Sequence, residues 1–391
     1  MIKREAEQTL KKLSKQFPIV AITGPRQSGK TTLAQYVFNN KNYVSLENPD
    51  ELEYSLEDPK GFLARFPEGA VLDEVQRNPK LFSYIQTIVD KQKKMGFYIL
   101  TGSQHFGLLS HISQSLAGRV GFVQLLPFTV NELIQSKVVS YTTHYEEIML
   151  KGLYPPVYDR NIEPQVWYPN YVMTYLERDV RQLLNIKELS QFQRFLRMCA
   201  ARVGQVLNLS GLGSDCGISH NTARSWISIL EASYIVYLLP PYYKNYGKRL
   251  IKSPKLYFYD TGLVSWLLSI QDKDHMTIHP MKGSIFENFI ISELIKISYN
   301  KGLTHNMFFW RDSSGVEIDI ILEKGTLLHP VEIKSSYTVN DDFFKNIKKW
   351  EKITGLQLPA YVVYGGDESF TRSGITILSW KDYRNIEHEK N

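Results

Sequence analysis

Apolar runs alternate with amphipathic, helix-like stretches through the first third of the chain. The apolar runs have the composition of β-strands and lie at residues 18–23, 42–46, 69–72, 97–101 and 120–125. Helical patterns fill most of the segments between them. Because strands joined by helical crossovers run parallel, this part is predicted to be an α/β domain with a parallel sheet.

The middle of the chain has a more helical pattern. Two short helices are predicted at 209–216 and 219–230, and a strand follows at 234–239. A basic turn comes next, with positive charges at Lys244, Lys248, Arg249, Lys252 and Lys255. Two short helices and a basic hairpin indicate a winged helix-turn-helix. Such a module either contacts DNA or packs against its neighbours, and the pattern leaves both readings open.

The last part again mixes helix and strand patterns. A helix is predicted at 283–299, and strands are predicted at 308–311, 316–322, 330–334, 361–364 and 375–380. This pattern predicts a second α/β domain. The expected domains are therefore 1–130, 131–270 and 271–391.

A glycine-rich turn joins the first apolar run to the first helix of the parallel-sheet domain. It fits the spacing G-x-x-x-x-G-K-[ST] of a phosphate-binding loop and has the strand–loop–helix context that such a loop requires. Lys30 is predicted to reach the β- and γ-phosphates of ATP, and Thr31 to hold Mg²⁺. The predicted nucleotide contacts are Gly24, Pro25, Arg26, Gln27, Ser28, Gly29, Lys30, Thr31 and Thr32. The alternative is a chance glycine turn.

Two adjacent carboxylates, Asp73 and Glu74, end the third apolar run. This is a Walker B pattern. Alone it would be weak evidence, but it is strong evidence when it follows a phosphate loop. Asp73 is predicted to bind Mg²⁺ with Thr31, and Glu74 to orient and deprotonate the attacking water.

Two further positions are candidates for the same site. Ser103, with Thr101 as second choice, follows the next strand and is expected to sense the γ-phosphate or position water; a simple turn is the alternative. Arg119 follows a glycine and is a candidate for stabilising transferred phosphoryl charge, in its own subunit or a neighbour. The alternative is a solvated turn arginine.

Taken together, the segments Gly24–Thr31, Leu72–Gln76, Thr101–Ser103 and Leu116–Arg119 resemble the AAA-type ATPases. The more specific resemblance is to a prokaryotic branch in which the ATPase is fused to a C-terminal domain of poorly characterised role. This resemblance implies a five-stranded P-loop sheet, ATP hydrolysis, Arg119 as a finger, and a homo-oligomer with shared ATP sites.

Charged residues alternate with apolar ones in the strands of the C-terminal domain. This period of two places Glu332 and Lys334 on one face of their strand, with Asp319 on the preceding strand and Glu287 on a helix. Converging carboxylates hold one or two Mg²⁺ ions, and a nearby lysine activates water. The set Glu287, Asp319, Glu332 and Lys334 resembles the active residues of the restriction-endonuclease-like PD-(D/E)xK fold. The alternative is a fold kept for binding or assembly that cuts nothing.

Composition and charge add limits on function. The 391 residues carry a net charge of +6, which permits a nucleic-acid partner. We find no apolar run long enough to span a bilayer and no signal peptide, so a cytoplasmic protein is expected. The leading hypothesis is an ATP-hydrolysing protein that acts on DNA. The alternative is a regulatory or scaffolding ATPase with an inactive nuclease-like domain and a protein partner.

Overall fold

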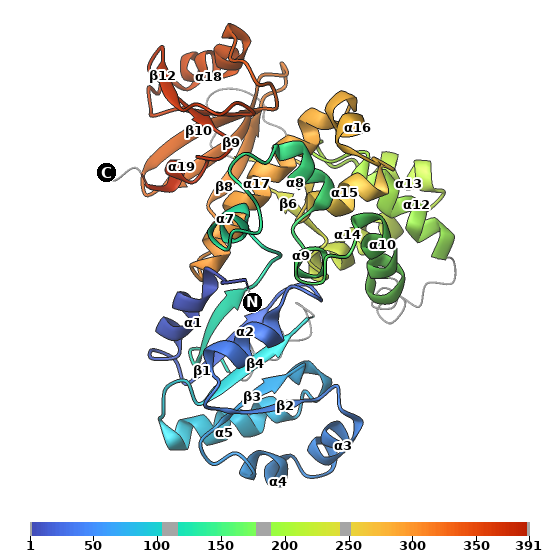
Figure 1. Ribbon diagram of the computed structural model, residues 1–391, viewed down its shortest axis with the longest axis vertical. Coiled ribbons are helices and arrows are strands. Elements are labelled where there is room, and N and C mark those ends of the chain that lie inside the picture. The colour runs from blue at the N-terminus through green and yellow to red at the C-terminus, as the bar shows by residue number, and fades with distance from the viewer. Residues whose placement is uncertain (1, 104–115, 177–188, 243–251, 389–391) are drawn as a thin grey trace.

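The computed structural model describes residues 2–103, 116–176, 189–242 and 252–388 (Figure 1). A parallel-sheet unit lies at one end of the long axis and a second sheet unit at the other, with a helical region beside the second unit. Within the described residues, no helix is long and apolar enough to cross a membrane.

The first unit contains a five-stranded parallel sheet in the order β2-β3-β4-β1-β5. Its strands are β1 (Ile19–Thr23), β2 (Asn42–Ser45), β3 (Ala70–Asp73), β4 (Tyr98–Gly102) and β5 (Val120–Gln124). The predicted parallel sheet is confirmed. Because parallel strands end at the same edge, the phosphate loop after β1 and the carboxylates at the end of β3 meet there.

Helices cover both faces of this sheet, which explains the continuous apolar runs of its strands. One face packs against α1 (Ala6–Leu13) and α2 (Lys30–Val37). The other packs against α4 (Pro59–Ala64) and α5 (Leu81–Gln92), with α3 (Pro49–Glu57) and the short η1 (Val75–Arg77) nearby. Residues of β1 alternate between the two apolar clusters, and all of β1 is buried.

The helical region contains the predicted pair of short helices, α13 (Leu209–Cys216) and α14 (His220–Ala232). Gly217 ends α13 in a left-handed conformation, with φ of +69°. Ser219 caps α14 by accepting a 3.0 Å hydrogen bond from the backbone N–H of Thr222. Strands β6 (Val236–Leu239) and β7 (Lys255–Phe258) then pair antiparallel.

The rest of the segment between the two large sheets is mainly helical. Its shorter helices are α7 (Val130–Gln135), α8 (Tyr145–Lys151), α9 (Pro155–Asp159), α10 (Pro164–Tyr171), the π-helical η2 (Val172–Leu176), α12 (Leu189–Ala200), α15 (Thr261–Leu267) and α16 (Lys273–Ile278). The helix α16 begins just after the predicted domain boundary between residues 270 and 271. Asp272 caps that helix by accepting a hydrogen bond from the N–H of His275.

The second sheet has six strands in the order β12-β13-β11-β10-β9-β8. The strands are β8 (Met307–Arg311), β9 (Glu317–Lys324), β10 (Leu327–Lys334), β11 (Tyr361–Tyr364), β12 (Phe370–Arg372) and β13 (Ile375–Ser379). Strands β8 to β10 are antiparallel, whereas β10, β11 and β13 run parallel. The predicted mixed α/β unit is therefore present, with η3 (Asp341–Phe344), α18 (Lys345–Thr354) and α19 (Asn385–His388) completing it.

The long helix α17 (Lys282–Asn300) links the helical region to the second sheet. Its Ile285, Phe289 and Ile290 belong to one apolar cluster that also includes Leu256 of β7 and Val331 of β10. Because α17 is apolar on most sides, it is buried along most of its length.

Candidate functional site

The phosphate loop depends on glycine at its first position. Gly24 has φ of +147°, and a Cβ there would lie 2.1 Å from the carbonyl oxygen of Leu125. Gly29 and Gln27 are also left-handed, with φ of +89° and +62°. The loop therefore turns sharply enough to place the N-terminus of α2, which begins at Lys30, at the edge of the sheet.

Lys30 folds back onto the loop. Its Nζ donates to the carbonyls of Gly24 at 3.0 Å and Pro25 at 2.8 Å. Burial lowers the pKa of Lys30 to about 8, while the neighbouring carboxylates of Glu74 and Asp73 oppose that shift. A triphosphate would give this ammonium group anionic partners in place of carbonyls.

The hydroxyl of Ser28 lacks a partner. Ser28 is fully buried, and within the described structure its Oγ has no hydrogen-bond acceptor or donor. A buried hydroxyl is normally hydrogen-bonded, so this orphan atom fits a loop that takes a polar ligand.

Asp73 is held by three hydroxyl groups. Thr31 Oγ1 lies 3.1 Å from Asp73 Oδ2 and 3.2 Å from Oδ1, and Tyr43 donates to Oδ2 at 2.8 Å. Thr101 also donates to Oδ1. Asp73 is thus beside Thr31, as predicted, and the two oxygen ligands suit Mg²⁺. Sequence reasoning missed Tyr43, which stands in a half-exposed strand with no local signal.

Glu74 faces the same space from a left-handed residue, with φ of +53°. Gln76 Nε2 donates to Glu74 Oε2 at 2.5 Å, and Ser103 Oγ donates to the same oxygen at 2.9 Å. Ser103 therefore contacts the proposed base, and Thr101 contacts the proposed metal ligand. These hydrogen bonds fix the direction of the carboxylate, which a general base requires.

A cavity of about 490 Å³ lies over this constellation. The predicted residues that line it are Arg26, Gln27, Gly29, Lys30, Thr31, Thr32, Asp73 and Glu74. Glu47 and four residues of the helical region, Pro155, Pro156, Asp159 and Arg160, complete the lining. The sequence carried no signal for these four, because they reach the cavity only through tertiary packing.

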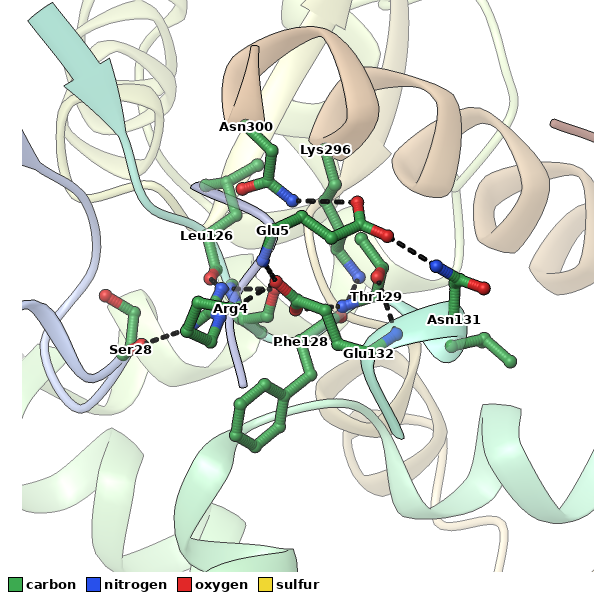
Figure 2. Close-up of polar contacts among 12 residues, drawn as sticks. Arg4, Glu5, Ser28, Leu126, Phe128, Thr129, Asn131, Glu132, Lys296 and Asn300 are labelled. Carbon is green, nitrogen blue, oxygen red and sulfur yellow. Dashed lines mark hydrogen bonds and ion pairs between the residues drawn. The ribbon is translucent and has the colours of Figure 1, made fainter. Parts of the chain in front are cut away.

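The guanidinium of Arg4 stabilises the phosphate loop by hydrogen bonding. It donates to the carbonyls of Ser28 at 2.8 Å and Leu126 at 2.7 Å, and to Glu132 Oε1 at 3.1 Å. Figure 2 shows this group between the loop and α7, with Lys296 and Asn300 of α17 nearby. Burial raises the pKa of Glu132, and Arg4 opposes that rise.

Arg119 lies at the opposite edge of the sheet from the phosphate loop. The N–H of Ile19, at the start of β1, bonds the carbonyl of Arg119, whereas the loop follows Thr23. These ends of β1 are about 13 Å apart, given the rise of a strand. Arg119 instead pairs with Asp90 at 2.6 and 2.9 Å. The fold thus corrects the same-subunit alternative, and a role toward a neighbouring subunit stays a prediction.

The C-terminal candidates converge at the hairpin of β9 and β10. Lys334 Nζ lies 3.5 Å from Asp319 Oδ2 and also contacts Glu332 Oε2. The N–H of Ile333 donates to Asp319 Oδ2 at 2.8 Å. Glu287 approaches from α17, and its carboxylate interacts electrostatically with Asp319. The sequence set is therefore brought together in space.

Glu332 is the most buried member of this group, with 1% of its surface exposed. Burial, followed by the neighbouring Asp319 carboxylate, raises the pKa of Glu332 to about 8. Its Oε1 is buried and has no hydrogen-bond partner in the described structure.

The C-terminal cluster meets only part of what a divalent cation requires from its ligands. No group of three or more His, Cys, Asp or Glu side chains in the described ranges is arranged to hold a metal ion by itself. Mg²⁺ is, however, commonly bound by one or two carboxylates together with water and substrate phosphate. Asp319 and Glu332, with the orphan oxygen of Glu332, meet that smaller requirement.

The sequence pattern assigned Lys255 to a basic turn, but the structure places it in a strand. It begins β7, is 2% exposed, and its Nζ pairs with Glu287 Oε1 at 3.0 Å and with Glu317. The other basic residues of the expected wing, Lys244, Lys248 and Arg249, lie outside the described residues. Lys252 is exposed.

The parallel sheet, its glycine loop and the carboxylates at the end of β3 define a P-loop ATPase fold of the AAA type. The model of a family described as AAA domain matches residues 16–134. Two families described as domains of unknown function, DUF8612 and DUF4143, match residues 142–274 and 282–383.

Relatives span nearly the whole chain. The uncharacterized proteins Rv2008c of Mycobacterium tuberculosis and Mb2031c of Mycobacterium bovis are each 29% identical over 380 residues, which cover 96% of this chain and 82% of the relative. Among solved structures, the Walker-type ATPase paby2304 of Pyrococcus abyssi matches with a TM-score of 0.48 and 15% identity, covering 68% of this chain and 96% of that one. The Thermotoga maritima RuvB Holliday junction branch migration motor matches with 0.30 and 18%, covering 60% and 88%.

Proposed function

We propose that the chain binds ATP with Mg²⁺ and hydrolyses it at the cavity above the phosphate loop. The observation that carries this proposal is the pairing of Thr31 with Asp73 at 3.1 Å beside a buried lysine. Thr31 and Asp73 would hold the cation, which neutralises phosphate charge when bound. Lys30 would exchange its carbonyl partners for the β- and γ-phosphates. Glu74, aimed by Gln76 and Ser103, would take the proton of the attacking water.

The test is to measure ATP binding by calorimetry and phosphate release by a coupled assay, each with and without Mg²⁺. Asp73→Asn should remove most of the Mg²⁺ dependence of both quantities, because one carboxylate charge of the cation site is lost. Ser83→Ala, an exposed change on α5, should leave both unchanged. Wild-type protein that neither binds nor turns over ATP would refute the proposal.

A second function is supported by the C-terminal cluster. We propose that Asp319 and Glu332 bind one divalent cation and that this centre acts on phosphodiester bonds of DNA. The supporting observation is the buried Oε1 of Glu332. This atom has no hydrogen-bond partner among the described residues, and the Asp319 carboxylate lies near the same side chain. Lys334, held against both carboxylates, would stabilise negative charge on a bound phosphate.

The competing reading is a scaffold whose nuclease-like fold binds protein. Plasmid and short single- and double-stranded DNA should be incubated with Mg²⁺ or Mn²⁺, and binding should be followed against salt. Phosphate contacts make affinity fall steeply with salt. Cleavage that disappears in Asp319→Ala and Lys334→Ala supports the nuclease reading. Absence of both cleavage and salt-dependent binding supports the scaffold.

A further inference from the structure

A lysine of the helical region lies inside the carboxylate cluster of the C-terminal unit. Lys255 Nζ is 3.0 Å from Glu287 Oε1, also contacts Glu317, and lies 5.6 Å from the ring centroid of Phe309. Tyr257, two residues along β7, donates to the same oxygen of Glu287. The cluster is therefore built from two regions of the chain. Lys255 is a buried cation that lies next to α17.

The position of Lys255 is fixed by backbone contacts. Asn288, which follows Glu287 on α17, accepts from the N–H of Phe258 at 2.6 Å and donates to its carbonyl at 3.0 Å. This pair of hydrogen bonds clamps β7 against α17, three residues from Lys255. A buried ammonium requires close carboxylate partners, and here it has two.

The carboxylates of the cluster differ in what already neutralises them. Glu287 and Glu317 are paired with Lys255, and Glu317 has Arg311 as a second partner at 3.2 Å. Asp319 and Glu332 share the single ammonium of Lys334, and Glu332 Oε1 is left without a hydrogen bond.

We propose that Lys255 is the permanent counter-ion of Glu287 and Glu317 and fills the place that a second divalent cation would take. The cluster then accepts one divalent cation, at Asp319 and Glu332. Glu287 neutralises Lys255 and is not a ligand of the divalent cation. This inference rests on the proposed cation site, whereas the expectation from the sequence treated Glu287 as part of the active set.

The experiment counts Mn²⁺ ions bound by nucleotide-free, full-length protein, using the electron paramagnetic resonance signal of free Mn²⁺. All proteins carry Asp73→Asn, so that the phosphate-loop site does not contribute. One ion is expected per chain in this background, and none after Glu332→Gln. Lys255→Met should bind two ions, because Lys255 no longer neutralises Glu287 and Glu317. Lys282→Met is the matched control, since Lys282 lies on α17 and pairs with Glu146 at 2.9 Å, and it should bind one.

Glu287→Gln and Glu317→Gln provide a test that keeps Lys255 in place. Each should still bind one Mn²⁺, with affinity lowered by at most about 100-fold, as expected for residues outside the coordination shell. Loss of the ion in Glu287→Gln would overturn the inference, as would a single ion in both the background protein and folded Lys255→Met. If Lys255→Met does not fold, the glutamine variants decide the question.

The outcomes separate this inference from the proposed cation site. No ion in the background protein but one in Lys255→Met would retain the role of Lys255 and refute the native cation site. No ion in either protein would refute both. One ion in the background and two in Lys255→Met would support both.

Discussion

The guanidinium of Arg4 donates a 2.8 Å hydrogen bond to the carbonyl of Ser28, which ties the first residues of the chain to the phosphate loop (Figure 2). The same group pairs with Glu132 at 3.1 Å, and both side chains are almost completely buried. Glu132 also accepts from the N–H groups of Glu5 at 2.7 Å and Thr129 at 2.9 Å. The loop is thus supported by the residues that precede α1 and by α7.

Arg4→Ala should lower the free energy of unfolding by about 3–5 kcal/mol, because it leaves the Glu132 carboxylate buried without its cation. Chemical denaturation followed by circular dichroism measures this change. The control is Lys94→Ala, which breaks an exposed ion pair with Glu68 at 2.9 Å and should cost less than about 1 kcal/mol. Equal losses of unfolding free energy in the two variants would show that the buried Arg4–Glu132 pair stabilises the fold no more than an exposed pair does.

Lys30→Ala should weaken ATP binding by about 10- to 150-fold, the range expected for losing hydrogen bonds from a charged group. Calorimetry with ATP and Mg²⁺ checks the affinity. Lys41→Ala is a suitable control, because Lys41 donates to the carbonyls of Glu68 and Phe97, away from the loop. Undiminished ATP turnover in Lys30→Ala would refute the assignment of residues 24–31 as a phosphate-binding loop.

Glu74→Gln should separate binding from chemistry. The glutamine keeps an oxygen that accepts from Gln76 and Ser103, so ATP should still bind. Turnover should fall by about 10²- to 10⁴-fold, because the general base is lost. Trapped ATP, measured after rapid gel filtration, would accompany this loss. Glu47→Gln alters another carboxylate of the cavity and should keep most of the turnover; normal hydrolysis in Glu74→Gln would exclude Glu74 as the base.

The parallel sheet and the residues of the phosphate loop were predictable because their signals are local. Gly24 must adopt a left-handed turn against Leu125, and Asp73 ends an apolar strand. Residues such as Arg160 and Tyr43 reach the cavity above the phosphate loop, or contact Asp73, only through tertiary packing.

Lys255 shows most clearly where sequence reasoning failed. A cluster of basic residues after a strand favours the turn of a basic hairpin, and that pattern assigned Lys255 to this turn. Pairing of β7 with β6 instead places Lys255 in a strand, where Glu287 of α17 neutralises it. Burial of a charge depends on a partner distant in the chain, which a local pattern does not contain.

Glu231→Gln should change how stability depends on pH. Burial raises the pKa of Glu231 from 4.5 to about 7. A raised carboxyl pKa means that the folded state holds the proton more tightly, so its stabilising effect is present at low pH and lost as pH rises to 7. Because the side chain is partly exposed, Glu231→Gln should be more stable than wild type by roughly 1–2 kcal/mol at pH 8. The two should converge near pH 4 in urea denaturation, and an equal difference at both pH values would contradict the assignment.

Arg119 offers a test of shared ATP sites between subunits. If it stabilises phosphoryl charge in a neighbour, Arg119→Ala should reduce turnover by about 10³-fold or more. Its ion pair with Asp90 is partly exposed, so exchanging that partner for a phosphate costs little. Mixing Arg119→Ala with Lys30→Ala should restore part of the activity, because one chain supplies the arginine and the other an intact loop. Asp90→Ala should not reduce turnover. An Arg119→Ala protein with wild-type turnover at every protein concentration would leave Arg119 as a surface arginine paired with Asp90.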